Sequence, residues 1–176
     1  LMTRSLPLAD AVVLITGAST GIGAAVAQQL ATQSPGIRLV LAARRLDRLE
    51  AIAAQCQTAG AKPLIVPTDM AQALAQTALA HFGQVDILVN NAGYGQMGPL
   101  ELMPPAACRR QFEVNLFGPL ALTQALIPGM RDRGGGRIIN ISSIGGRTAF
   151  PMGGLYSGSK FALEAMSDAL RMELEP

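Results

Sequence analysis

In the stretch AVVLITGASTGIG, residues 11–23, an apolar run leads directly into three closely spaced glycines. Residues 11–16 are apolar or β-branched and predict a strand, and Gly17, Gly21 and Gly23 follow where a helical pattern begins. Glycines at such a turn let backbone N–H groups approach an anion, and a helix N-terminus adds a partial positive charge. The spacing is GxxxGxG and not the GxGxxG of the common dinucleotide fingerprint. The stretch therefore predicts a strand, a turn that can cradle a pyrophosphate, and a helix.

Short apolar runs alternate with helical patterns along the rest of the chain. The hydrophobicity of each run is nearly continuous, which indicates strands buried on both faces of a parallel sheet with right-handed crossovers. No repeat, charge block or linker divides the sequence, so we expect one domain over residues 1–176, a doubly wound α/β fold with helices on both faces. The predicted strands are 11–16, 37–43, 62–67, 85–90 and 136–142, and the predicted helices are 22–33, 46–59, 71–82, 105–131 and 155–174.

The composition excludes several classes of function. Of the 176 residues, 49% are hydrophobic and only 4% aromatic, and the net charge of +2 is dispersed, so we expect no nucleic-acid partner. Cys56, Cys108 and the single histidine, His81, lack the spacing of a metal site, and we expect no metal. Asp10 interrupts the apolar residues near the N-terminus, and no run approaches ~20 apolar residues. We therefore expect a cytoplasmic protein without a membrane span.

The end of the second predicted strand bears on the identity of the dinucleotide. In a Rossmann-type unit, an acid about 20 positions past the glycines selects NAD by binding the free 2′-hydroxyl of the ribose. Ala43 stands at that distance from Gly23, and Arg44 and Arg45 follow it. Because two guanidiniums suit a 2′-phosphate, we expect NADP (NADPH), with Arg44 as the direct contact. The alternative is that residues 44–50 are only the solvated start of a helix.

The glycine turn also fits a second class of enzyme. GASTG, residues 17–21, matches the GxSxG pattern of a hydrolase, with Ser19 as the nucleophile between a strand and a helix. This interpretation requires a histidine base, and only His81 exists, at the end of a predicted helix where a cation is an ordinary structural choice. A hydrolase would also leave Tyr156 and Lys160 without a role.

Tyr156 and Lys160 stand four residues apart among small neighbours, at the start of the last predicted helix. Residues at i and i+4 share a helix face, so the phenol and the ammonium can act on one small volume. A nearby cation favours the ionised phenol, which makes the pair suitable for acid–base catalysis. In isolation, the same pair is also typical of an amphipathic tyrosine and a surface lysine.

Five motifs resemble the short-chain dehydrogenase/reductase family, in order and over nearly the whole chain. They are TGASTGIG (16–23), NNAG (90–93), Asn115 in FEVNLFG, NISSIGG (140–146) and YSGSK (156–160). The resemblance implies an NADP-dependent oxidoreductase that interconverts an alcohol and a ketone or aldehyde by hydride transfer. It also implies a site at the carboxyl ends of the strands.

The resemblance carries roles over to matching residues. Tyr156 would be the general acid/base, Lys160 would assist it and bind the nicotinamide ribose, Ser143 would orient the substrate oxygen, and Asn115 would support a proton relay. Ser142 lies one residue out of register, and only one of the two serines can face the site. Asp69 would contact the adenine beside Met70, although a strand-end Asp can also be a helix cap. The implied cofactor-binding residues are Gly17, Ala18, Ser19, Thr20, Gly21, Ile22, Gly23, Arg44, Asp69, Met70, Asn90, Ala92, Gly93, Tyr156 and Lys160.

The sequence departs from the family pattern in two places. Family members continue past the tyrosine helix through two further strands and a segment that covers the substrate, whereas this sequence ends at MELEP, and the helix before Asn90 is short. We therefore expect segments to be missing after Pro176 and after Met70. A cofactor-binding module without efficient catalysis is the alternative function.

Two further expectations concern the molecules that this protein binds. Met97, Leu100 and Met103 suggest an apolar wall and hence an apolar substrate, and the alternative is that they only pack against the rest of the protein. The resemblance also implies a homo-oligomer, a dimer or tetramer, formed through the helices at 105–131 and 155–174.

Overall fold

The computed structural model describes residues 8–174. The chain forms two compact units. We call residues 8–92 and 121–139 the sheet unit, and residues 93–120 and 140–174 the tyrosine unit. The single domain expected from the sequence stays a prediction.

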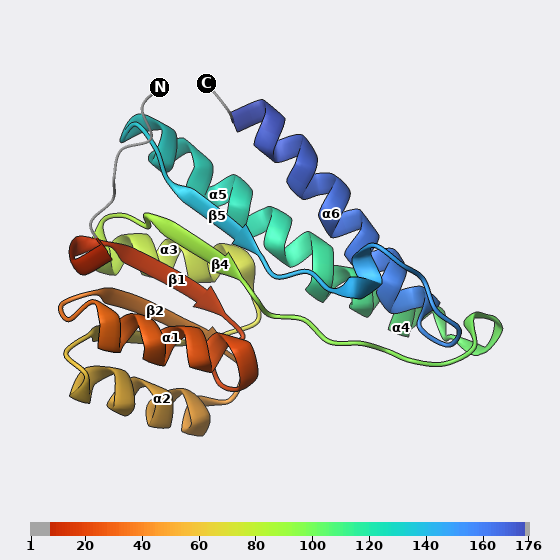
Figure 1. Cartoon of the computed structure of the whole chain (residues 1–176), viewed down its shortest axis with the longest axis horizontal. Helices are drawn as coiled ribbons and strands as arrows, with labels where there is room; N and C mark the ends of the chain where they lie inside the picture. Colours follow the sequence, from red (N-terminus) through yellow and green to blue (C-terminus); the bar gives the residue numbers. More distant parts are fainter. Residues whose placement is uncertain (1–7, 175–176) are drawn as a thin grey trace. The chain divides into compact units, whose positions relative to one another are not determined.

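A five-stranded parallel sheet has the order β3-β2-β1-β4-β5 (Figure 1). β1 lies between β2 and β4, and Leu14 pairs with Val40 on one side and with Leu88 on the other. This order confirms the doubly wound α/β fold predicted from the alternating patterns. The strands are β1 (Val12–Thr16), β2 (Arg38–Ala43), β3 (Lys62–Pro67), β4 (Ile87–Asn90) and β5 (Arg137–Asn140).

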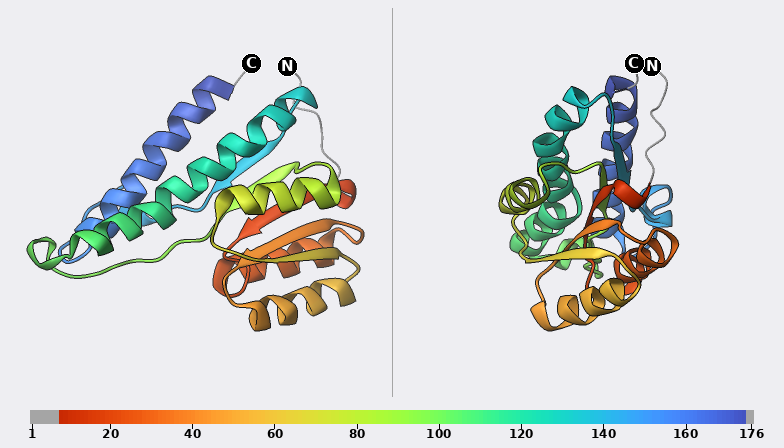
Figure 2. Two further views of the ribbon diagram at one scale, coloured as in Figure 1. Left: turned by 180° about the vertical axis from the view of Figure 1, so that it is seen from behind. Right: turned by 90° about the vertical axis from the view of Figure 1, so that its left-hand side faces the viewer.

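Helices of the sheet unit cover both faces of the sheet (Figure 2). Val12 and Leu14 pack in one cluster with Leu74 of α3 and Leu126 of α5. Because adjacent strand residues point to opposite faces, the buried residue Val13 faces α1 and α2. The helices of this unit are η1 (Leu8–Asp10), α1 (Gly21–Gln33), α2 (Leu46–Thr58), α3 (Ala71–Phe82) and, from residue 121 onward, α5 (Gly118–Asp132).

The start of β4 differs from the prediction. The predicted strand begins at residue 85, whereas β4 begins at Ile87. Asp86 is buried, and its Oδ2 accepts a hydrogen bond from the backbone N–H of Val12 at 2.8 Å. Gln84 Nε2 donates to the same carboxylate at 3.0 Å. Asp86 therefore satisfies the first N–H of the neighbouring strand with its side chain, a use that a strand pattern does not reveal.

The tyrosine unit is helical and contains the largest difference from the prediction. The continuous helix predicted over 105–131 is wrong, because a π-helical turn (η3, Glu113–Phe117) interrupts it. The last helix is confirmed over Gly154–Leu174, one residue longer than predicted. The elements of this unit are η2 (Leu100–Leu102), α4 (Pro105–Phe112), η3, the first turn of α5, η4 (Ile144–Gly146) and α6 (Gly154–Leu174). Within residues 8–174, no helix has both the length and the apolar character needed to cross a bilayer.

Candidate functional site

The glycine turn after β1 needs glycine for two separate reasons. Gly17 and Gly21 have φ values of +67° and +58°, in the left-handed region that other residues rarely adopt. A β-carbon at Gly17 would also lie 2.9 Å from Asn91 Nδ2 and 3.0 Å from the Cα of Ala92. Gly23 is buried, and a β-carbon there would lie 2.6 Å from the carbonyl oxygen of Gly17. Gly17 and Gly23 therefore leave no room for a side chain, whereas Gly21 needs glycine for its φ value alone.

Asn91 and Thr16 hold this turn, and the sequence analysis missed both residues. Thr16 Oγ accepts hydrogen bonds from the backbone N–H groups of Asn91 and Ala92, each at 3.0 Å. Asn91 Nδ2 donates to the carbonyl oxygens of Thr16 at 2.9 Å and Gly17 at 3.3 Å. The NNAG motif contains two adjacent asparagines, and only the first of them, Asn90, is among the predicted cofactor-binding residues.

The N-terminus of α1 is suited to an anion. Thr20 is its N-cap residue, and the Thr20 side chain makes no capping hydrogen bond. The first N–H groups of a helix lack partners within the helix, and they carry the positive end of its dipole. Ala18 is buried and donates its N–H to Ala42 at 3.1 Å, whereas Thr20 and Ile22 are exposed. The structure thus leaves the part of the turn after Ala18 accessible.

The other sheet-unit candidates lie at the same edge of the sheet. Arg44 and Asp69 follow the carboxyl ends of the adjacent parallel strands β2 and β3, and both are exposed. The N-cap of α3 is Met70, whose N–H is bound by Thr68 Oγ at 3.0 Å, so Asp69 is not the cap of this helix. Asn90 differs, because it is buried at the end of β4 and its Nδ2 donates to Thr123 Oγ at 3.4 Å.

The hydrolase interpretation fails on topology. Ser19 follows β1 at the carboxyl edge of the sheet. Since β3 and β4 are parallel members of one sheet, α3 runs back between them to the opposite edge, and His81 is in its last turn. The His81 ring packs edge-on against Phe82, with 4.5 Å between centroids. The only histidine of the chain is therefore unavailable to Ser19.

In the tyrosine unit, Tyr156 and Lys160 occupy consecutive turns of α6, as predicted. Lys160 is only 5% exposed, and its Nζ donates to the carbonyl oxygen of Ile141 at 2.7 Å. Burial lowers the pKa of Lys160, and the carboxylate of Glu164 acts against this by raising it. Lys160 is therefore not the snorkelling surface lysine of the alternative interpretation.

Two glycines make room for the Tyr156 ring. A β-carbon at Gly145 would lie 3.1 Å from Tyr156 Cε1, and one at Gly95 would lie 3.4 Å from Tyr156 Cδ2. The ring is thus bordered by backbone on two sides, and the residue remains half-buried. This arrangement restricts the orientation of the phenol without covering it.

Of the two serines after β5, Ser143 is the better placed. Ser143 Oγ accepts a hydrogen bond from the N–H of Gly145 at 3.1 Å and caps η4, and the residue is half-buried. Ser142 Oγ is buried against Gly146 and has no hydrogen-bond partner among the residues that the structure describes. β5 ends at Asn140, so the two serines follow the strand, and the predicted strand end at residue 142 is wrong. Their side chains still differ, because the Ser142 hydroxyl is buried in the protein.

Asn115 lies in the π-helical turn and is buried. Its Oδ1 accepts from the N–H of Tyr94 at 3.1 Å, and its Nδ2 donates to the Tyr94 carbonyl at 2.9 Å and to Ser159 Oγ at 3.0 Å. Gln111, one turn earlier, also donates to the Tyr94 carbonyl, at 2.6 Å. A β-carbon at Gly93 would lie 3.2 Å from Asn115 Oδ1 and 3.6 Å from Lys160 Nζ. Both amide hydrogens of Asn115 are engaged, so this side chain holds the segment after Gly93.

Gln111 and Ser159 are supporting residues that the sequence analysis missed. Gln111 stands four positions before Asn115 on the same helix face, but the residues just before it are also polar, so the sequence offers no clear signal for it. Ser159 Oγ donates to the carbonyl of Tyr156 at 2.7 Å and so links Asn115 to the turn that carries the tyrosine. The YSGSK motif contains Ser159 but does not show this contact.

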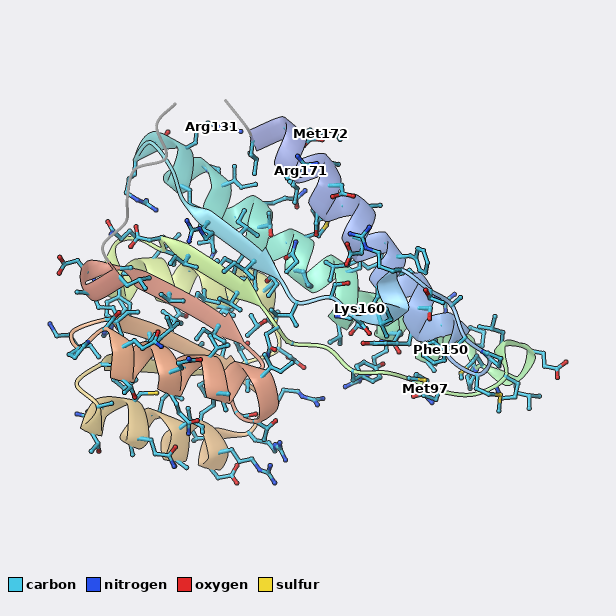
Figure 3. The ribbon with its side chains drawn as sticks, viewed as in Figure 1. Met97, Arg131, Phe150, Lys160, Arg171 and Met172 are labelled. Carbon is cyan, nitrogen blue, oxygen red and sulfur yellow. The ribbon has the colours of Figure 1, made fainter. Side chains whose placement is uncertain are left out.

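Apolar side chains flank the tyrosine. Met97 and Phe150 are both exposed, and they come from the segments that carry Gly95 and Gly145 (Figure 3). Phe150 Cε1 would lie 3.5 Å from a β-carbon at Gly145. The N–H of Gly98 donates to the carbonyl of Met152 at 2.8 Å, which joins the two segments. The surroundings of Tyr156 therefore present apolar surface.

The parallel sheet with a glycine turn after β1 defines a Rossmann-type nucleotide-binding fold. Residues 11–176 match the family model described as short chain dehydrogenase. A mouse protein, dehydrogenase/reductase SDR family member 7B, is 39% identical over 177 residues that include 96% of this chain. This chain spans about half of the mouse relative, 54% of its length. The chain belongs to the short-chain dehydrogenase/reductase family of oxidoreductases.

Two solved structures agree with this assignment. A metagenomic short-chain oxidoreductase in complex with NADP is 38% identical with a TM-score of 0.90, and the match covers 96% of this chain and 77% of that one. An alcohol dehydrogenase from the archaeon Thermococcus sibiricus, complexed with 5-hydroxy-NADP, is 33% identical with a TM-score of 0.85. That match covers 93% of this chain and 71% of the archaeal one.

Proposed function

We propose that this protein is an NADP(H)-dependent oxidoreductase that interconverts an alcohol and a ketone or aldehyde, with Tyr156 as the general acid/base. The observation that carries the proposal is the buried Lys160 ammonium one helical turn from Tyr156, because burying a charged group costs free energy that an ordinary surface lysine avoids. Both residues are on α6, and the segment that carries Ser143 is bound to the same helix through Ile141.

The sheet unit fits a dinucleotide. The closely packed glycine turn and the uncapped start of α1 suit a pyrophosphate, with Gly17, Ala18, Ser19, Thr20, Gly21, Ile22 and Gly23 as its cradle. Arg44 is exposed just past β2, where a 2′-phosphate can be paired, and no acid stands there to favour NAD. Two family structures hold NADP or an NADP derivative, in keeping with this preference. Asp69 and Met70 would contact the adenine, and Asn90, Ala92 and Gly93 would line the ribose side.

The residues of the tyrosine unit would carry out and support the proton transfer. NADPH, when bound, would supply the hydride for the carbonyl carbon during reduction. Tyr156 gives its hydroxyl proton to the carbonyl oxygen, so that the carbonyl becomes an alcohol, and the phenolate is stabilised by the Lys160 ammonium. Ser143 orients the same oxygen through its hydroxyl. Asn115 acts by holding the segment from Gly93 to Tyr94, since both of its amide hydrogens are already donated.

The substrate class follows from the surroundings of Tyr156. Met97 and Phe150 leave apolar surface exposed beside it, so we propose an apolar carbonyl or alcohol compound. Binding of NADPH to the protein is measured first, and its oxidation is then followed with a panel of ketones and aldehydes of increasing apolar size. Turnover that rises with apolar size supports the proposal. NADPH binding without turnover of any compound would indicate a binding module instead.

A further inference from the structure

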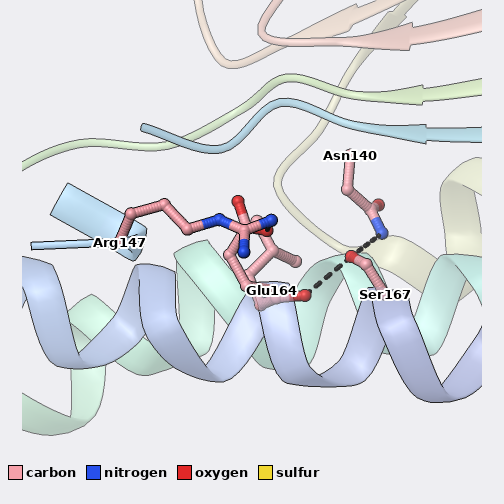
Figure 4. Close-up of polar contacts among 5 residues, drawn as sticks. Asn140, Arg147, Glu164 and Ser167 are labelled. Carbon is pink, nitrogen blue, oxygen red and sulfur yellow. Dashed lines mark hydrogen bonds and ion pairs between the residues drawn. The ribbon is translucent and has the colours of Figure 1, made fainter. Parts of the chain in front are cut away.

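A segment of the tyrosine unit, Asn140–Arg147, is bound to α6 along its length (Figure 4). We call it the serine segment because it carries Ser143. At its start, Asn140 Nδ2 donates to Ser167 Oγ at 2.8 Å. Next to Asn140, the carbonyl of Ile141 accepts from Lys160 Nζ at 2.7 Å. At its end, Arg147 Nη2 lies 2.9 Å from Glu164 Oε2. The serine segment is therefore held at three points that bracket Ser143.

Glycines let the serine segment approach α6 between these contacts. A β-carbon at Gly146 would lie 3.0 Å from Glu164 Cγ, 3.1 Å from the carbonyl of Lys160 and 2.8 Å from Ser142 Oγ. The preceding residue, Gly145, borders the Tyr156 ring and binds Ser143 Oγ through its N–H. A shift of the segment at Gly146 would consequently move the groups that set Ser143 and the tyrosine ring.

We propose that Arg147 and Glu164 are a positioning pair, whose ion pair closes the end of the serine segment on α6 and so fixes Ser143 relative to Tyr156 and Lys160. This inference rests on the proposed function, because Ser143, Tyr156 and Lys160 matter together only if they act on one substrate. Glu164 is mostly covered, with 23% of its side chain exposed, whereas Arg147 is 69% exposed. The ion pair thus joins an exposed guanidinium at the end of the serine segment to a mostly buried carboxylate on α6.

Glu164 has a second effect through its charge. Tyr156, Lys160 and Glu164 are spaced by four residues and share one face of α6. The charged group that faces Lys160 on its own helix is Glu164, and Arg147 of the serine segment faces Glu164. Outside α6 and the serine segment, the near neighbours of Lys160 are two uncharged residues, Gly93 after β4 and Asn115 in η3. Glu164 therefore raises the pKa of Lys160 and helps to keep this buried ammonium charged.

Kinetics of Glu164→Gln and Arg147→Gln test the positioning pair. A displacement of catalytic groups by a fraction of an ångström to 1 Å can cost up to about 100-fold in rate, so we expect each variant to lower kcat about tenfold with little change in NADPH affinity. Arg147→Lys, which keeps the cation, should retain most of the activity. The double variant should be no slower than Glu164→Gln, because the Arg147 substitution then removes a contact that is already lost. Additive losses would overturn the proposal.

Asp168→Asn is the matched control. Asp168 is exposed on the same helix, one turn beyond Glu164, and its substitution removes the same charge. We expect wild-type kcat for this variant. Activity of Glu164→Gln equal to that of the control would overturn the proposal.

The pH profile separates the two effects of Glu164. Removing this carboxylate lowers the pKa of Lys160, so the alkaline loss of activity should move to lower pH in Glu164→Gln. Arg147→Gln keeps the carboxylate, and its alkaline limb should not move to lower pH although its kcat falls. A profile unchanged in Glu164→Gln would contradict this assignment.

A measurement without turnover keeps the inference separate from the proposed function. The chain has only two lysines, Lys62 and Lys160, so protein labelled with ¹³C at the lysine side chains gives two signals, which Lys62→Arg assigns. The Lys160 signal should titrate at lower pH in Glu164→Gln than in wild type and in Asp168→Asn. An unmoved titration in Glu164→Gln overturns the charge effect of Glu164 on Lys160 even if the wild-type enzyme is active. Absence of turnover in wild type with a shifted titration counts against the proposed function alone.

Discussion

Lys160 carries a charge that the protein buries. In the sequence it is one of two residues in a motif that a surface helix could also contain. In the structure its ammonium is almost fully buried and bound to the carbonyl of Ile141. A lysine that can extend into solvent rarely accepts this cost, so a function that uses the charge is the simplest account.

Replacement of Arg44 tests the cofactor preference at the residue scale. Arg44→Asp should weaken NADPH binding about 10- to 100-fold, because charge-assisted hydrogen bonds to a phosphate are lost and a repulsive charge is introduced. NADH binding should be unchanged or improved. The measurement is the ratio of the two dissociation constants.

Arg48→Asp supplies the control for Arg44. Arg48 is exposed in the first turn of α2 and gives the same change in net charge. Its ratio of dissociation constants should stay close to that of wild type. An equal change in both variants would mean that overall charge, and not a 2′-phosphate contact at Arg44, sets the preference.

Single residues that act through backbone contacts were the hardest to predict. Asn91 and Gln111 both bind backbone groups far along the chain, and their partners are known only after the chain is folded. The prediction for Ser143 rests on its spacing from Tyr156, which matches the family, and Ser142 is one residue out of that register. Spacing within a motif is visible in a sequence, whereas a hydrogen bond across 75 residues, as between Asn91 and Thr16, is not.

At the scale of elements, β1, the glycine turn and α1 were predicted together as a strand–turn–helix unit. The apolar run and the glycines predicted it because each requirement is local: burial of the strand, left-handed φ and helix initiation. The π-helical turn at 113–117 could not be predicted in this way. Its residues continue a helical pattern, and the buried Asn115 binds Tyr94, which no helical period encodes.

The two left-handed glycines of the turn provide a matched pair of variants. Gly17→Ala combines a left-handed backbone with a β-carbon 2.9 Å from Asn91 Nδ2, whereas a β-carbon at Gly21 has no heavy atom within 4 Å. The φ penalty alone is roughly 1–2 kcal/mol and applies to both variants. We expect Gly17→Ala to lower the free energy of unfolding by at least about 1 kcal/mol more than Gly21→Ala, because overpacking adds to strain.

Urea denaturation of the two alanine variants measures this difference. Equal losses in the free energy of unfolding would show that the Asn91 side chain moves aside for the new β-carbon at no cost in stability. The turn would then be constrained by its backbone angles alone.

On the scale of the whole molecule, the predicted residues fall into two sets. The sheet unit carries the glycine turn, Arg44, Asp69, Asn90 and Ala92, and the tyrosine unit carries Gly93, Asn115, Ser143, Tyr156 and Lys160. The sheet unit offers an uncapped helix start that is suited to an anion, and the tyrosine unit holds a buried ammonium one helical turn from a phenol. The proposed reaction requires both sets, one for the cofactor and one for the proton.

The buried Lys160 makes the global stability depend on pH. Burial lowers its pKa in the folded state below that in the unfolded chain, so the unfolded state binds more protons over that interval. The cost of the buried charge is thus fully present at neutral pH and is relieved as the pH rises toward the ordinary lysine value. The free energy of unfolding of wild type relative to Lys160→Met should therefore increase with pH in the alkaline range.

Lys62→Met is the control for this stability measurement. Lys62 is the other lysine, exposed at the start of β3. Denaturant unfolding at several alkaline pH values gives both differences. The same pH dependence in the two variants would contradict a specific cost of burying Lys160.

Turnover of Tyr156→Phe tests whether Tyr156 is the general acid/base of the proposed reaction. Tyr94→Phe is the matched control, because Tyr94 is the only other tyrosine and uses its backbone, through Asn115 and Gln111, in the contacts described above. We expect Tyr156→Phe to bind NADPH like wild type and to lose at least about 100-fold in kcat for carbonyl reduction, whereas Tyr94→Phe should keep most of its activity. Carbonyl reduction by Tyr156→Phe at the wild-type rate would show that Tyr156 is not the general acid/base.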